Sequence, residues 1–159
     1  MDPKPRVHNK SKATTLSITD HPPAKIAEWY WKIKSTMEPV PGLGISQCYK
    51  IPAKDGRFTE NQKKVAYAYQ IIAYARFGST ALAQVAASKT RDDLTISHLC
   101  GTRDCCNPLH LVLESKAIND DRTHCHACMQ SAALHNPESW RNLWENCGGC
   151  PHHPRCGSC

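Results

Sequence analysis

The sequence predicts one small α+β domain, on three observations. Two stretches in the N-terminal half carry apolar residues at helical spacing. Two apolar, β-prone segments, residues 94–100 and 110–115, flank a short loop. Cysteines and histidines gather from residue 98 onward and would add cross-links to a core with only two Phe. A chain of 159 residues can bury one such core.

Residues 1–20 are polar and basic without periodicity, which predicts a flexible tail. Residues 21–159 then form a single domain. Within it we distinguish a helical region (21–90), a core (94–124) and a Cys/His-rich C-terminal segment (125–159). The basic residues of the tail would suit a weak nuclear-import or phosphate-contacting arm: Lys4, Arg6, Lys10 and Lys12.

A first helix is predicted over residues 22–37, where apolar residues recur at helical spacing after two prolines. Its apolar face carries Ile26, Trp29, Tyr30 and Ile33. The Pro- and Gly-containing segment 38–44 then breaks the chain. Residues 45–52 predict a short strand that carries Cys48, and residues 54–59 predict a turn.

A second amphipathic helix is predicted from about Glu60 to Arg76, with Gly78 as its stop. Its apolar face carries Val65, Tyr69, Ile72 and Ala73. Ser79 or Thr80 can cap a short third helix that runs through Ala87.

The segments 94–100 and 110–115 predict a hairpin-like pair of strands around the loop GTRDCCNP. Residues 114–125 then predict a short helix. Beyond Cys125 loop signals prevail, except that residues 137–146 could form two helical turns.

Ten cysteines and nine histidines point to metal rather than disulfides. Disulfides need an oxidising compartment, and the N-terminus has no apolar segment typical of a secretion signal. No apolar run is long enough for a membrane span. We therefore expect a nuclear or cytoplasmic zinc protein that is not secreted. The net charge of +6 favours a polyanionic partner.

A first zinc site is predicted at C-x4-C-x4-H, which places Cys100, Cys105 and His110 around one loop. Zinc needs a fourth ligand, and Cys48 is the only cysteine among the first 99 residues. Such a site would attach the strand of Cys48 to the hairpin. Cys106 is left as a spare thiol.

The C-terminal segment predicts a second zinc site, because it holds six cysteines. Paired CxxC spacing selects one ligand set: Cys125, Cys128, Cys147 and Cys150. The C-x-H-x3-C spacing selects another: Cys125, Cys150, His152 and Cys156. A third site from the remaining residues, including Cys159, stays open.

The string SHLC-x4-C-x-NPLHL-x2-ES-x3-N, from Ser97 to Asn119, resembles the core of the His-Cys-box homing endonucleases. CYKIP, from Cys48, resembles the upstream segment of that family, which supplies the fourth ligand of the first zinc. The spacing of Cys150, His152 and Cys156 resembles its second zinc knuckle, with Cys125 as the distant partner. The resemblance implies a ββα-metal (His-Me finger) core, of the HNH-like kind, braced by two structural zinc ions with the N-terminal helices alongside.

The resemblance also implies a Mg²⁺-dependent endonuclease acting on double-stranded DNA. His98 would activate the attacking water, and Asn119 would hold the single Mg²⁺. These residue types suit the roles, because a neutral imidazole accepts a proton near neutral pH and a carboxamide oxygen suits a hard cation. Asp120 and Asp121 are fallback metal ligands that helical geometry turns away from Asn119.

The family places an arginine at the scissile phosphate, and this chain departs from that pattern. Counting back from ARFG reaches Lys63, with Lys64 beside it and Arg57 a few residues earlier. Lysine binds phosphate as a point charge, without the two-pronged geometry of arginine.

Two further departures concern partners. Residues 49–62 are too few for the long DNA-reading ribbon of the homing enzymes, and the tail through which those enzymes dimerise is absent after Cys159. Whether the protein forms a dimer therefore stays open. Whether it nicks one DNA strand or cuts both strands also stays open. The alternatives to a nuclease are a non-catalytic zinc module that binds nucleic acid and a zinc-stabilised protein-interaction domain.

Overall fold

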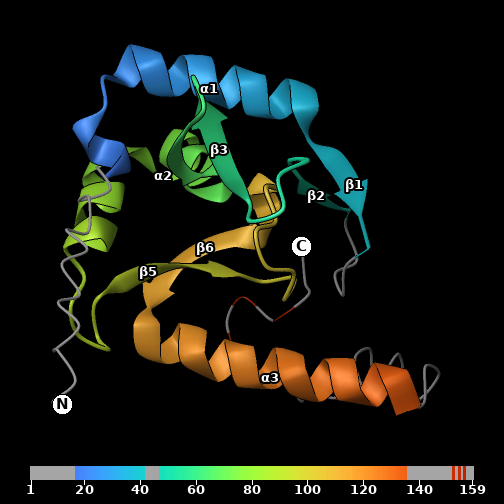
Figure 1. Ribbon diagram of the computed structural model, residues 1–159. Coiled ribbons are helices and arrows are strands. Elements are labelled where there is room, and N and C mark those ends of the chain that lie inside the picture. Colours follow the sequence, from blue (N-terminus) through green and yellow to red (C-terminus); the bar gives the residue numbers. More distant parts are fainter. Residues whose placement is uncertain (1–16, 42–46, 136–151, 153, 155, 157–159) are drawn as a thin grey trace, which may run out of the picture.

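A computed structural model describes residues 17–41, 47–135, 152, 154 and 156 (Figure 1). The basic tail and the predicted helical turns at 137–146 lie outside these residues. The described chain combines helices with three two-stranded antiparallel sheets. It is therefore a mixed helix and small-sheet fold, as the sequence predicts. No helix in these ranges is long and apolar enough to cross a membrane.

The N-terminal part begins with a short 3-10 helix η1 (Ile18–Asp20) and helix α1 (Pro23–Thr36). The predicted apolar face of α1 is buried at Ile26, Trp29 and Ile33, with Tyr30 packed partly against the core. Strand β1 (Glu38–Val40) then pairs with β2 (Cys48–Lys50). The segment 38–44, predicted only as a break, thus begins with a strand.

The helix predicted from Glu60 is wrong in its first part. Strand β3 (Arg57–Glu60) and strand β4 (Lys63–Tyr67) form a hairpin there, and helix α2 (Ala68–Ala87) begins only afterwards. Asn61 and Gln62 both have positive φ, 48° and 65°, which is the backbone of a tight two-residue hairpin turn. Since this turn pairs Glu60 with Lys63, Val65 lies on a strand rather than on a helical face.

Helix α2 is kinked at Gly78, whose φ of 85° and ψ of 169° are not helical. Only glycine adopts this backbone readily, so the kink follows from the sequence. The predicted stop at Gly78 and the short helix predicted through Ala87 are thus confirmed, because the non-helical backbone of Gly78 separates two helical parts within α2. Its first half buries Ala68, Ile71, Ile72 and Ala73.

Strands β5 (Leu94–His98) and β6 (Leu111–Ser115) form the predicted hairpin, with His98 opposite Leu111. A 3-10 turn η2 (Pro108–His110) leads into β6. Helix α3 (Lys116–His135) follows directly and packs against both strands. It runs ten residues beyond Cys125, where the sequence predicted loop. In Figure 1, α1 and α3 lie on opposite sides of the molecule, with the β5–β6 hairpin between them.

Candidate metal centres and active site

Four buried side chains, from β2 and from the loop after β5, meet at one point. The ligand atoms of Cys48, Cys100, Cys105 and His110 all lie within 4.8 Å of one another. The Nδ1 atom of His110 is 3.4 Å from the Sγ atoms of both Cys48 and Cys105. All four are at most 1 % exposed. Three sulfurs and one imidazole around a closed, buried point match the donor set and ligand count of a structural zinc site.

The backbone holds the loop of this first cluster against β2. The peptide N–H of Cys106 donates to the carbonyl of Tyr49 at 2.7 Å. The Asn107 side chain donates to the carbonyl of Gln47 at 2.7 Å. Its Oδ1 accepts from the N–H of Leu109, and this hydrogen bond caps the start of η2. Cys106 itself packs into the main apolar core, where burial raises its thiol pKa to about 12. The neighbouring cysteines thus face different environments, and Cys106 stays outside the cluster.

The protonation of the cluster favours a cation. Burial raises the pKa of the Cys48 thiol. A hydrogen bond with Cys105 raises the pKa of Cys100, and the same bond lowers the pKa of Cys105 to about 5. The two sulfurs thus lie within hydrogen-bond reach of each other, and a bound dication would stabilise both as thiolates.

A second group joins α3 to the C-terminal segment. The ligand atoms of Cys125, His152 and Cys156 lie within 4.8 Å of one another, and Sγ of Cys156 is 3.5 Å from Nδ1 of His152. Cys150, Cys147 and Cys159 lie outside the described residues. Cys128 is exposed and is not in this group; its Sγ lies 3.9 Å from Nε2 of His124. Of the two predicted ligand sets, the structure brings together three members of the C-x-H-x3-C set.

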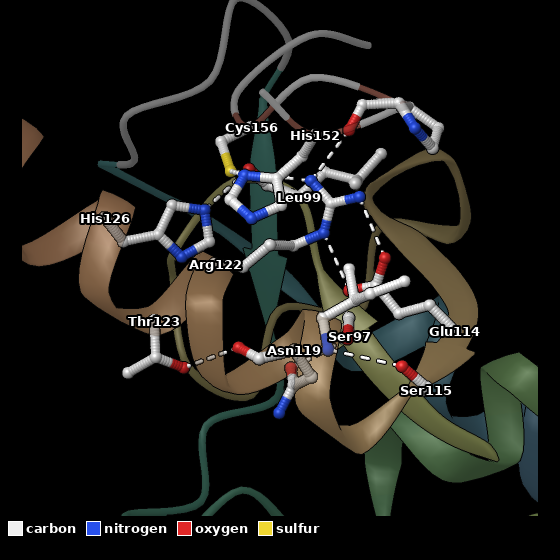
Figure 2. Close-up of polar contacts among 12 residues, drawn as sticks. Ser97, Leu99, Glu114, Ser115, Asn119, Arg122, Thr123, His126, His152 and Cys156 are labelled. Carbon is white, nitrogen blue, oxygen red and sulfur yellow. Dashed lines mark hydrogen bonds and ion pairs between the residues drawn. The ribbon is translucent and has the colours of Figure 1, made fainter. Parts of the chain in front are cut away.

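Through one face, helix α3 contacts the Cys125/His152/Cys156 group and the backbone of Leu99, next to the loop of the first cluster, as Figure 2 shows. Arg122 forms a two-pronged ion pair with Glu114 of β6, with Nε–Oε1 at 2.7 Å and Nη2–Oε2 at 2.9 Å. Its Nη1 donates to the carbonyl of Pro154 and to Sγ of Cys156. One turn further along α3, Nε2 of His126 lies 3.1 Å from the carbonyl oxygen of Leu99. The same ring packs closely against Gly101, since a Cβ atom added at Gly101 would lie only 2.8 Å from Cγ of His126. The sequence analysis did not identify Arg122, Glu114 or His126.

His98 ends β5 and has a buried ring nitrogen without a partner. Its Nε2 has no hydrogen bond to any described residue, and its ring contacts the Tyr69 ring at 4.8 Å between centroids, edge on. Burial lowers the pKa of His98 to about 4, against a hydrogen bond with the backbone of Cys105 that raises it. The imidazole is therefore neutral at physiological pH.

Asn119 lies in the first turn of α3, beside the same end of β5. The hydroxyl of Ser97 donates to its Oδ1 at 2.7 Å (Figure 2). Since Ser97 immediately precedes His98, one strand end positions both predicted catalytic residues. Asp120 and Asp121 are exposed.

Among the predicted basic residues, Arg57 is the one linked to His98. Its guanidinium lies 4.7 Å above the Tyr67 ring, Tyr67 stacks on Tyr69 at 5.6 Å, and Tyr69 contacts His98. Lys63 is exposed at the other end of β4, and Lys64 is paired with Asp55. These side chains form a row of aromatic rings beneath Arg57. The sequence contained a signal for this aromatic row, because Tyr67 ends β4 and Tyr69 follows two positions later, in the first turn of α2.

Beside this aromatic row is a polar groove of about 640 Å³. Its charged lining comprises four cations and two carboxylates, so it carries net positive charge. It joins the turn before β3 to the loop of the first cluster and is lined by Lys54, Asp55, Arg57, Lys64, Tyr67, Arg103 and Asp104. The sequence analysis did not single out Lys54 or Arg103.

Among protein families, the model of the zinc-binding loop region of homing endonuclease matches residues 31–158. Comparisons with the curated proteins and with the solved structures gave no match. The matched range contains both Cys/His clusters, the β5–β6 hairpin and α3. The resemblance seen in the sequence is thus confirmed. The chain belongs to the homing-endonuclease family with a zinc-binding loop region, the His-Cys-box family.

Proposed function

We propose that the protein is a Mg²⁺-dependent endonuclease of double-stranded DNA, with its active site at the end of β5 and the first turn of α3. One observation carries the proposal: consecutive residues of β5 present the unpartnered Nε2 of His98 and hold the carboxamide of Asn119. On this view the hairpin and α3 form a ββα-metal core. Both clusters bind structural zinc, the second with Cys150 as the further ligand.

The residues at the first turn of α3 fit a magnesium ion. Mg²⁺ prefers oxygen ligands and takes few of them from protein. The Oδ1 of Asn119 is such an oxygen; it accepts one hydrogen bond, from Ser97, and a carbonyl oxygen has a second lone pair. When bound, the ion supplies positive charge for the phosphate and the departing 3′ oxygen. Ser97 fixes the carboxamide before the ion arrives.

His98 takes the proton from the attacking water. The burial that keeps its imidazole neutral also leaves Nε2 without a competing donor or acceptor among the described residues. The Tyr69 edge and the backbone of Cys105 hold the ring in place. A general base needs this combination of an unshared lone pair and a fixed direction.

Arg57 and the neighbouring groove contact the DNA backbone. Arg57 is only partly buried and reaches the groove that also contains Lys54 and Arg103. Arginine binds phosphate with two parallel hydrogen bonds, which suits Arg57 for the role that the family gives to an arginine. The net charge of +6 supports binding to a polyanion. With DNA as substrate, we place the protein in the nucleus.

The test is DNA cleavage by zinc-loaded protein with and without added Mg²⁺, on supercoiled plasmid and on long linear DNA. EDTA is omitted because it would also remove zinc. We expect wild type to nick or linearise DNA only with Mg²⁺, and His98→Ala to lose at least about 100-fold in rate, as loss of a general base does. His135→Ala, an exposed histidine at the far end of α3, is the matched control and should cleave normally.

Zinc content and circular dichroism must match between His98→Ala and wild type. Intact DNA in every lane, together with salt-sensitive DNA binding that His98→Ala leaves unchanged, would favour the non-catalytic zinc module instead.

A further inference from the structure

We propose that Arg122 is a positioning residue that couples metal occupancy of the Cys125/His152/Cys156 cluster to the placement of Asn119. The inference rests on the proposed function for the role of Asn119 as a metal ligand. The coupling itself is a statement about α3 and is tested without cleavage.

The hydrogen bonds of Arg122 are divided between two parts of the molecule. Its side chain is 1 % exposed, so each of its N–H groups needs a partner within the protein. Glu114, itself 6 % exposed, accepts from Nε and Nη2. Nη1 depends on the C-terminal segment, where Pro154 accepts at 2.7 Å and Cys156 at 3.4 Å. If that segment moves away, Nη1 loses both of these partners.

A buried guanidinium without partners is costly, because desolvating a cation costs several kcal/mol unless its hydrogen bonds are replaced. If the segment moves away, α3 can lower this cost by turning or fraying so that Nη1 of Arg122 reaches water. Arg122 is three residues after Asn119, on the same side of the helix. A turn or fraying that exposes Arg122 therefore displaces the Asn119 carboxamide from Ser97.

The coupling also runs in the opposite direction. A metal-bound thiolate is deprotonated and is a better acceptor for Nη1 than a thiol. Cys125, on α3 itself, contributes a further sulfur to the same cluster. Bound zinc thus strengthens the Nη1–Cys156 contact, and a well-placed Arg122 strengthens retention of zinc. This reciprocity is required of any coupling between two sites.

The experiment is a double-mutant cycle in the full-length protein with Arg122→Lys, Cys156→Ser and both together. The first readout is the rate of zinc release to a chromogenic chelator. The second is hydrogen exchange of peptides covering residues 116–124. Lysine keeps the charge but cannot bridge Glu114 and Cys156 at once. Arg91→Lys, at an exposed arginine, is the matched control.

We expect Arg122→Lys to release one zinc about 10-fold faster than wild type, as is usual when a partner of a metal ligand is lost. Each single variant should speed exchange over residues 116–124, and the double variant should add little to either, because both remove the same contact. Arg91→Lys should behave as wild type. Unchanged exchange in Arg122→Lys, or strictly additive effects in the double variant, would overturn the coupling. If Cys156→Ser does not fold, Arg122→Lys alone still decides it through both readouts.

Cleavage then separates this inference from the proposed function. If the protein is a nuclease, Arg122→Lys should need several-fold more Mg²⁺ for half-maximal cleavage, with a smaller change in rate at saturating Mg²⁺. A wild type that never cleaves DNA would refute the proposed function only, since zinc release and exchange are measured without DNA.

Discussion

Single contacts between side chains set the geometry of the candidate active site. Ser97 is completely buried and donates to Asn119, whereas the next residue, His98, has an unpartnered Nε2. The two neighbours thus have opposite roles: one uses its hydrogen bond to orient another side chain, and the other keeps its nitrogen available. A buried polar atom without a partner is costly for stability and needs an explanation, which a catalytic role would supply for His98.

Removing the Ser97 hydroxyl should separate positioning from chemistry. We expect Ser97→Ala to lower the free energy of unfolding by about 1 kcal/mol through the lost hydrogen bond. It should also raise the Mg²⁺ concentration for half-maximal cleavage, because the carboxamide becomes free to rotate. Urea unfolding and a Mg²⁺ titration measure the two effects. Ser35→Ala, at an exposed hydroxyl on α1, is the control. An unchanged Mg²⁺ requirement would show that Ser97 does not position Asn119.

At the scale of elements, the β5–β6 register brings the site together. Pairing of His98 with Leu111 places the last residue of β5 beside the end of the first-cluster loop. The segment NPLHL serves two purposes here: His110 turns into the cluster and Leu111 into the core, whereas Leu109 is 60 % exposed. A change in this register would displace both the proposed metal ligand His110 and the end of β5 that carries the candidate catalytic residue His98.

The two leucines of NPLHL offer a matched pair for testing this register. Leu111→Ala should destabilise the protein by about 2–5 kcal/mol, the usual cost of deleting a fully buried leucine side chain. Leu109→Ala should change stability by no more than about 0.5 kcal/mol, as exposed substitutions do. Denaturant unfolding of the zinc-loaded proteins measures both. Similar losses for the two variants would mean that Leu109 is covered in solution.

The sequence predicted the elements that carry the site better than those beside it. The hairpin at 94–115 was predictable because its two apolar segments contain the β-branched residues Thr95, Ile96 and Val112 and bracket a loop of ligands. The strand at Lys63–Tyr67 was not, because its apolar residues fit a helix equally well. Pairing of β3 with β4 across the turn at Asn61 and Gln62 favours the strand over the helix. These two turn residues lack the glycine that usually marks such a turn in a sequence.

The same limit applies to the site residues. The cluster of Cys48, Cys100, Cys105 and His110 followed from spacing, since zinc requires few residue types at short intervals. Arg122 and His126 could not be found in this way, because a helical sequence does not show which face is buried. The groove residues Lys54 and Arg103 come from segments that only the folded chain brings together.

For the whole molecule, zinc held by the two clusters would supply the cross-links that supplement a small apolar core. The first cluster is fully buried and connects β2 to the β5–β6 hairpin, and the second connects α3 to the C-terminal segment. Family membership and these two Cys/His groups both indicate zinc. Stability of the domain should therefore depend on metal.

Two buried cysteines test this dependence. Cys48→Ser should remove one zinc per chain and lower the melting temperature strongly, because an essential ligand is lost. Cys106→Ala, equally buried but in the apolar core, should retain full zinc and lose only modest stability from the missing sulfur. Zinc analysis and calorimetry distinguish them. Full zinc in Cys48→Ser would exclude Cys48 as a ligand.

The spacing of the first cluster also bears on the order in which the chain assembles. His110 lies only 5 residues from Cys105 but 62 from Cys48. The entropy cost of closing a loop rises with its length, so the hairpin loop can capture an ion with its three local ligands well before β2 arrives. Recruitment of Cys48 then completes the tetrahedron and brings the N-terminal helices onto a hairpin that is already formed. A bound ion would therefore first stabilise the β5–β6 hairpin and only later connect it to the N-terminal part of the domain.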